Sequence, residues 1–153
     1  MASFPAELLA LARVCVAVAL GAVIGIEREL AAKPAGLRTH MLVAGSAALF
    51  VGLGEFLVDY WTVPEHGQQL RLDPIRLFEA LVTGIAFLGA GTILRDRDGA
   101  HNGVSGLTTA ASLLFTGVVG ATVAVGQYVL AVGSAVLLLF TLRLVGAFEK
   151  RFL

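Results

Sequence analysis

The chain has 153 residues, of which 58% are hydrophobic and only 14% are charged, and its mean hydropathy is +0.87. Such a composition is too apolar for a soluble domain and is typical of a membrane protein. The formal net charge is zero, which argues against a nucleic-acid partner, because binding to phosphates needs an excess of basic side chains. The single cysteine excludes an intramolecular disulfide and a CxxC metal site.

Apolar runs of about 17 to 20 residues, long enough to cross the hydrocarbon core as helices, alternate with short charged clusters. A β-barrel strand needs instead about ten residues of alternating polarity, and these runs are apolar on every side. The first run lacks the cleavage pattern of a signal peptide and is expected to be retained. The sequence therefore predicts one domain over residues 1–153, an all-α, polytopic helical bundle in the lipid bilayer, with about five transmembrane helices at Leu8–Ile26, Thr39–Leu57, Ile75–Leu94, Leu107–Val125 and Tyr128–Leu144.

The distribution of lysine and arginine predicts the orientation, because cytoplasmic loops beside membrane spans carry the excess of basic residues. With the N-terminus outside, eight basic residues fall on the cytoplasmic side and three on the outer side, the latter being Arg13, Arg71 and Arg76. The sequence thus predicts an external N-terminus and a cytoplasmic C-terminus, in agreement with an odd number of spans.

The start of the third span carries the first candidate site. Asp73 and Pro74 have the pattern of a helix N-cap followed by proline at the first helical position. Arg76 and Glu79 follow at steps of three, so Asp73, Arg76 and Glu79 are expected on neighbouring positions of one helix face. Glu79 lies about one turn inside the apolar run, where an ionisable group is costly and by default faces the bundle interior or water. Two interpretations stay open, a cap with an ion pair and an ion or partner site.

Small residues mark the predicted helix contacts, because helices in a bilayer associate through close packing and interhelical hydrogen bonds. Gly21 and Gly25 form a GxxxG pattern in the first span. Small residues in the third and fourth spans predict that these two helices touch along their backbones. The hydroxyl groups are expected to bond across the contact or to carbonyls of their own helix. These residues are Gly84, Gly89 and Gly91 in the third span and Thr108, Thr109, Ser112 and Thr116 in the fourth.

Four motifs together resemble the MgtC/SapB family of bacterial inner-membrane proteins in order and spacing over most of the chain. They are "GAVIGIERE" at 21–29, "AGLRTHMLVAGSAALF" at 35–50, "DPIRLFEALVTGIAFLGAGTI" at 73–93 and "VSGLTTAAS" at 104–112. Many family members also carry a soluble C-terminal cytoplasmic domain, whereas this chain stops at Leu153. Roles that depend on that domain are therefore not expected here.

The resemblance implies a function in bacterial survival at low magnesium and, in pathogens, in virulence inside host phagocytes. The best-known member is understood to restrain the F-type ATP synthase by binding it, so other inner-membrane proteins, and further copies of this chain, are the expected partners. The residues that match the family motifs, and to which a functional or packing role is carried over, are Glu27, Arg28, Arg38, Thr39, Asp73, Arg76, Gly84, Gly89, Gly91, Thr108 and Thr109.

Two classes of function remain from the residues themselves. A membrane regulator needs a packed bundle with an exposed face for a partner. A Mg²⁺ transporter or sensor, the alternative, needs oxygen ligands at membrane depth, and Glu79 is the only carboxylate well within a span. No cofactor is expected, and a Mg²⁺ site stays an open alternative. An enzyme is not expected, because no HExxH or nucleophile elbow is present, and His40 is interpreted as an interfacial or hydrogen-bonded residue.

Overall fold

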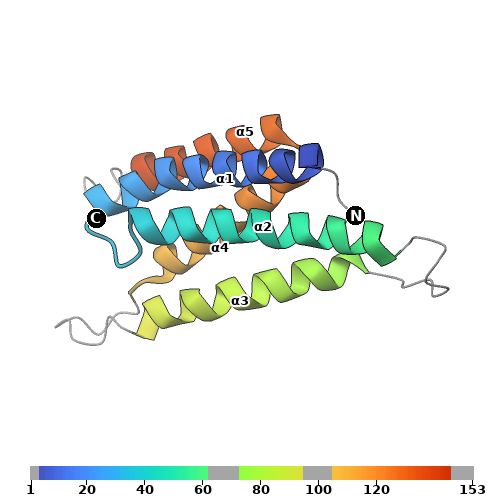
Figure 1. Ribbon diagram of the computed structural model, residues 1–153. Coiled ribbons are helices and arrows are strands. Elements are labelled where there is room, and N and C mark those ends of the chain that lie inside the picture. Colours follow the sequence, from blue (N-terminus) through green and yellow to red (C-terminus); the bar gives the residue numbers. More distant parts are fainter. Residues whose placement is uncertain (1–3, 62–72, 95–104, 146–153) are drawn as a thin grey trace.

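Figure 1 shows the computed structural model of the chain, which describes residues 4–61, 73–94 and 105–145. The predicted all-α bundle is confirmed. Its helices are α1 Phe4–Leu30, α2 Leu37–Trp61, α3 Pro74–Leu94, α4 Leu107–Ala124 and α5 Tyr128–Phe140, which continues into a π-helical turn, η2, at Thr141–Val145. Five basic residues of the orientation count lie outside the described residues, at Arg71, Arg95, Arg97, Lys150 and Arg151.

Successive helices run in opposite directions (Figure 1). The start of α1, the end of α2 and the start of α3 lie at one end of the bundle, called here the N-terminal end. The turn at residues 31–36 and the start of α4 lie at the other end, called here the turn end. The first four helices are long and apolar enough to cross a membrane, whereas the fifth apolar helix, Tyr128–Leu144, is shorter.

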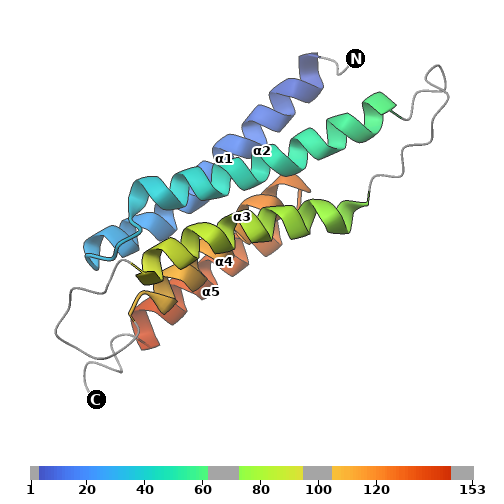
Figure 2. The same ribbon diagram turned by 90° about the horizontal axis from the view of Figure 1, so that it is seen from below.

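Helix α4 occupies the centre of the bundle, where it contacts each of the other four helices. Helix α3 lies on the outside and packs mainly against α4, as the two ribbon views show (Figures 1 and 2). The difference in burial is large, since 56% of the α4 span is buried against 11% of the α3 span. Most of the α3 surface therefore remains free for lipid or for another protein.

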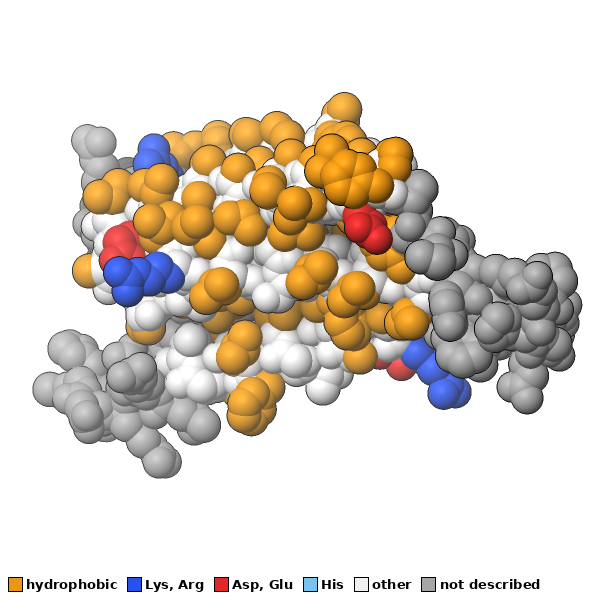
Figure 3. Space-filling model, in the orientation of Figure 1, with side chains coloured by type: hydrophobic (Ala, Val, Ile, Leu, Met, Phe, Trp, Pro, Cys, Tyr) orange, Lys and Arg blue, Asp and Glu red, His pale blue; other side chains and the backbone are white. Residues whose placement is uncertain are grey.

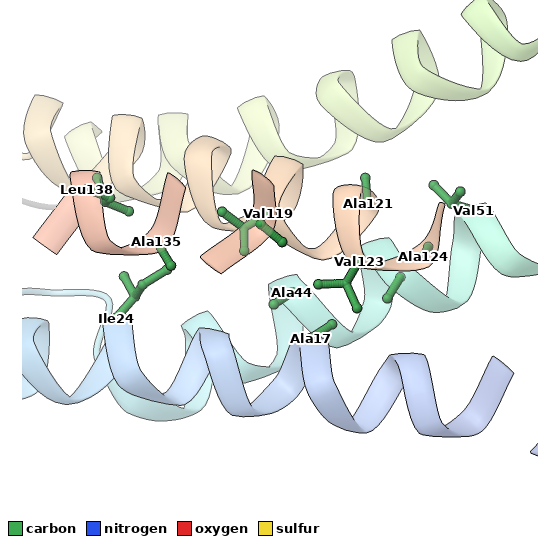
Figure 4. Packing of buried hydrophobic residues seen from close by; sticks show 12 residues of the cluster. Ala17, Ile24, Ala44, Val51, Val119, Ala121, Val123, Ala124, Ala135 and Leu138 are labelled. Carbon is green, nitrogen blue, oxygen red and sulfur yellow. The ribbon is translucent and has the colours of Figure 1, made fainter. Parts of the chain in front are cut away.

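Small side chains let α1, α2 and α4 approach closely. Ala17, Ala44 and Val119 belong to the buried cluster shown in Figure 4. A Cβ atom at Gly21 would lie 2.5 Å from the His40 carbonyl oxygen, and one at Gly120 would collide with the Ala44 carbonyl group. Glycine is required at both positions because each faces the backbone of a neighbouring helix.

Only one of the three predicted packing glycines of α3 lies at the contact with α4. A Cβ atom at Gly89 would lie 3.1 Å from Cβ of Ala110 in α4, so this glycine lies at the helix contact. At Gly84 and Gly91 a Cβ atom would meet nothing within 4 Å, because these two positions face away from α4. Close contact with α4 was predicted for all three glycines of α3, and the structure shows it for Gly89 but not for Gly84 or Gly91.

Charged and apolar side chains occupy different parts of the surface in the view of Figure 3. The acidic and basic side chains lie at the two ends of the bundle, and hydrophobic side chains cover the length between them. Phe87, well inside α3, is an example of an apolar side chain between the two ends, with 80% of its surface accessible. This arrangement fits a bilayer, which solvates apolar side chains along the spans and charged ones at the interfaces.

Candidate functional site

The last turn of α1 places two charged side chains inside the bundle at its turn end. Glu27 is 8% exposed and Arg28 is 3% exposed. Arg28 Nη1 lies 3.7 Å from Glu27 Oε2, too far for a hydrogen bond. Within the described ranges, Glu27 Oε2 and Arg28 Nε and Nη2 are buried without a hydrogen-bond partner. The two charges form an ion pair, but these three atoms lack hydrogen bonds, and burying polar atoms without hydrogen bonds is costly; the functional or partner role of the two residues stays a prediction.

His40 lies beside this pair and links α2 to α4. Its side chain is fully buried, and Nδ1 lies 2.9 Å from the Gly36 carbonyl oxygen. Nε2 lies 3.2 Å from Oγ of Ser112, which is buried on α4. The interpretation of His40 as a hydrogen-bonded residue is confirmed.

The bonds of His40 allow two arrangements that differ in charge. The Gly36 carbonyl only accepts, so Nδ1 carries a proton. The single proton of Ser112 Oγ is donated either to the Thr109 carbonyl oxygen, 2.8 Å away, or to His40 Nε2. In the first case Nε2 must donate and the ring is a cation, and in the second the ring is neutral. For the contact with Ser112 to be a hydrogen bond when the ring is neutral, the hydroxyl must point to His40.

The turn between α1 and α2 is held by a side chain that caps the second helix. Glu29 Oε2 accepts a hydrogen bond from the Leu37 amide at 3.0 Å, which satisfies one free donor at the start of α2. A side chain at Gly36 would collide with this carboxylate. Arg38, a predicted site residue, is exposed on the first turn of α2, and Thr39 is half-buried next to it.

A groove of about 610 Å³ separates α2 from α3 on the outside of the bundle. Two predicted residues line it, Thr39 near the turn end and Gly84 in the middle of α3. Ser46 of α2 and Ala80 of α3 are among the other lining residues, so parts of both walls are formed by short side chains. The rest of the lining is apolar and comes from Leu42, Val43, Ala47, Phe50, Leu81, Ile85 and Leu88.

The predicted site at the start of α3 is exposed. Asp73 Oδ1 accepts a hydrogen bond from the Ile75 amide at 3.0 Å, the bond of an N-cap. Arg76 Nε lies 4.0 Å from Asp73 Oδ2, a long contact between exposed side chains that contributes little. Glu79 was expected to face the bundle interior or water, and it is exposed rather than interior. Within residues 73–94 the ion pair of Arg76 is with Asp73 rather than with Glu79.

The predicted residues therefore do not form one site. Glu27 and Arg28 lie in the buried cluster at the turn end, Gly84 lines the groove with Thr39, and Asp73 caps α3 at the opposite end. On α4, Thr108 is exposed, whereas Thr109 is buried and its carbonyl oxygen accepts from Ser112. No group of three or more His, Cys, Asp or Glu side chains able to hold a metal ion occurs in residues 4–61, 73–94 and 105–145.

Sequence reasoning missed two connections between distant residues. One is the bond between His40 and Ser112, and the other is an ion pair between Arg13 of α1 and Glu55 of α2 at the N-terminal end. Arg13 and Glu55 are the charged residues inside the first two predicted spans, and a charge at that depth usually has a partner. Their oppositely charged side chains were the signal that could have paired them.

A family model described as "MgtC family" matches residues 14–151. The chain belongs to the MgtC family. It is 38% identical over 127 residues to the putative magnesium transporter YhiD of Escherichia coli K12, a match that covers 82% of this chain and 55% of that protein. It is 37% identical over 123 residues to protein MgtC of Salmonella typhimurium LT2, covering 80% of this chain and 46% of that protein.

An uncharacterized protein of Haemophilus influenzae is 34% identical over 140 residues, covering 92% of this chain and 57% of that protein. The chain thus spans about half the length of the curated relatives it matches. No solved structure matches the chain significantly. The matches extend over the helices that form the buried cluster and the groove, so MgtC family membership applies to the part of the chain that carries both.

Proposed function

We propose that this MgtC family protein is a regulator in the bacterial inner membrane that binds a transmembrane helix of another membrane protein in the groove between α2 and α3. The observation that carries the proposal is the groove itself. It runs along an apolar surface, and a Cβ atom at Gly84 would meet nothing within 4 Å. Close helix contact in a bilayer depends on such short side chains, since they let two backbones approach.

The exposure of α3 supports the same function. Only 11% of its span is buried although it carries Gly84, Gly89 and Gly91, residues that weaken a helix unless close packing makes use of them. Gly89 is used within the chain, against Ala110. Gly84 opens into the groove, where a second helix would cover it.

The packing of the bundle centre favours a regulator over a transporter. Between α1, α2 and α4 the interior is filled by Ala17, Ala44, Val119 and Val123, each at most 1% exposed (Figure 4). A hydrated divalent cation needs oxygen ligands and room for water, and this layer offers neither to it. The name of the YhiD relative keeps magnesium transport as the competing function, to be decided by measurement.

The F-type ATP synthase is the first partner to test, on the basis of the family resemblance. A Cβ atom at Gly84 has open space, so the leucine variant places a bulky side chain in the groove, and the same change at Gly91, where a Cβ atom also has open space, is a matched control on the same helix. We expect Gly84→Leu to fold normally and to lose both co-purification of the synthase and inhibition of its ATP-driven proton pumping. Gly91→Leu should retain both.

Three results would refute or change the proposal. Equal binding by both variants would remove the groove from partner binding. If the parent, but not Gly84→Leu, captures inner-membrane proteins other than the synthase, the groove would remain the binding site and its partner would be another protein. Magnesium flux into vesicles that contain the purified parent protein would favour the transporter. Growth at low magnesium should follow partner binding in the two variants.

The proposed orientation places the N-terminal end of the bundle outside and the turn end in the cytoplasm, as the distribution of basic residues predicts. Lys33 and Arg38 would then be exposed at the cytoplasmic end of the bundle, where Arg28 and Glu27 are buried. Reporter fusions after Leu153 should give a cytoplasmic signal and fusions within residues 62–72 an external one. The opposite pattern would reverse the orientation and leave the groove proposal unchanged.

A further inference from the structure

A second cavity opens at the N-terminal end, where α1 and α2 diverge (Figure 2). Its volume is about 220 Å³. One part of its wall is apolar and includes Leu9 and Phe56, whereas Arg13 and Glu55 bring opposite charges to the same space. The cavity is separate from the groove between α2 and α3, since the two share no lining residue.

Arg13 is held in place by a bond that leaves part of its side chain free. Nη1 donates to the Ala124 carbonyl oxygen at 2.8 Å, at the end of α4, where the helix dipole favours a positive charge. The same nitrogen lies 3.3 Å from Glu55 Oε2. Its Nη2, which carries two N–H groups, bonds to no group in the described ranges, whereas Nε is buried without a partner, and 25% of the side chain is exposed. A fixed guanidinium with spare donors is suited to an anionic group.

Glu55 contributes the complementary charge. Its Oε2 accepts from Arg13, and 51% of its side chain is exposed. A carboxylate can accept several hydrogen bonds, so it retains capacity for a donor beside Arg13. The cavity therefore offers a cation and an anion side by side, next to an apolar wall. A ligand that matches all three carries both charges and a hydrocarbon chain.

The position along α1 identifies the source of such a ligand. Helix α1 has 27 residues and is about 40 Å long, about 10 Å more than a hydrocarbon core. Arg13 lies about 13 Å from the start of this helix, within reach of the head-group layer for a long side chain. A membrane lipid is the amphiphile present at that depth.

We propose that this cavity binds one zwitterionic phospholipid with a primary ammonium head group, of the phosphatidylethanolamine type. The phosphate accepts from the free donors of Arg13, the ammonium group donates to Glu55, and an acyl chain lies along Leu9 and Phe56. The quaternary ammonium of phosphatidylcholine cannot donate to Glu55, and phosphatidylglycerol has no positive group. The site is thus expected to select among lipids that share the same acyl chains.

The test uses the purified full chain in mild detergent, with native mass spectrometry to count bound lipid during titration. The probes are dioleoyl phosphatidylethanolamine, dioleoyl phosphatidylcholine and dioleoyl phosphatidylglycerol. The ethanolamine lipid should bind about tenfold more tightly than the other two, the ratio expected from one charge-assisted hydrogen bond. Equal binding of the three lipids would overturn the proposal.

Two variants locate the site. Gly52 lines the cavity and has no atom within 4 Å of a Cβ position, so Gly52→Leu places a bulky side chain in the cavity and should abolish the preference. Gly133→Leu on exposed α5, where the same space is open, is the matched control and should keep it. Glu55→Gln should bind the ethanolamine and choline lipids equally, and it tests the site if Gly52→Leu fails to fold. A preference that persists in a folded Gly52→Leu or Glu55→Gln variant would contradict the assignment.

Discussion

Replacing Gly21 with alanine adds one methyl group at the closest contact between α1 and α2. The new Cβ atom would lie 2.5 Å from the His40 carbonyl oxygen and 2.9 Å from Cβ of Ala44. Ordinary van der Waals contact starts at 3.4 Å, so the two helices must separate by about 0.9 Å. A gap of that size forfeits between a quarter and a half of the dispersion attraction between the facing atoms.

The cost follows from that displacement. Overpacking of a close contact destabilises by about 1–3 kcal/mol. The better helix propensity of alanine offsets about 0.5–1 kcal/mol of this. The middle of these ranges gives a loss of about 1 kcal/mol in the free energy of unfolding for Gly21→Ala, which corresponds to a fall in melting temperature of about 2–4 °C for a domain of this size.

The assay is thermal unfolding in mild detergent, followed by the loss of helical circular dichroism. The matched control is Gly133→Ala, since a Cβ atom at Gly133 meets nothing within 4 Å and should leave the melting temperature unchanged or slightly raised. Equal melting temperatures for the Gly21 and Gly133 variants would refute the close contact and with it the role of the GxxxG pattern of α1.

Three more predictions use the same assay. Gly89→Leu should destabilise the bundle by forcing α3 from Ala110, whereas Gly91→Leu should leave the melting temperature unchanged, and a loss in both would show that α3 lies elsewhere. The free energy of unfolding of Asp73→Asn should stay within about 1 kcal/mol of the parent value, because the amide oxygen still caps α3, whereas Asp73→Ala should lose about 0.5–2 kcal/mol. Impaired growth at low magnesium with a folded Asp73→Asn variant would show that the charge has a further role. His40→Ala should lower the free energy of unfolding by about 2–4 kcal/mol and Ser112→Ala by about 1 kcal/mol, since the first leaves a cavity and removes two hydrogen bonds, and equal losses would contradict this.

The helices themselves were predictable because a bilayer imposes a simple rule on sequence. Apolar runs of sufficient length must be helical to satisfy their backbone groups, and the charged clusters between them set the connections. The helix α5 shows the limit of this rule, since its run of apolar residues is as continuous as the others, yet the helix is shorter and ends in a π-helical turn.

The direction in which each helix face points was harder to predict. Glu79 was expected to face the bundle interior or water, because a charge at that depth avoids lipid, and in the structure it lies on the exposed side of α3, the outermost helix. Gly84 and Gly89 have the same side chain, yet only Gly89 faces α4. A helix that is apolar on all sides gives no periodic signal for its orientation, so these contacts follow from the packing of the whole bundle.

In the buried polar cluster, too, the motifs marked the residues but did not show which residues contact each other. The family motifs marked Glu27 and Arg28 as candidates, and both are buried. The bond from His40 to Ser112 joins residues 72 positions apart. Their pairing depends on the register between α2 and α4, which is set by Gly120 against Ala44. No local pattern in a single sequence encodes that register.

The central claim is that the groove between α2 and α3 holds a helix of another membrane protein. The most direct measurement is photo-crosslinking in cells from a benzophenone side chain placed at Ser46, which lines the groove, or at Val136, which is exposed on α5. The account predicts a defined adduct with a membrane protein from Ser46 that disappears when Gly84→Leu is added, and no such adduct from Val136. An equal adduct from both positions, or one from Ser46 that persists with Gly84→Leu, would contradict it.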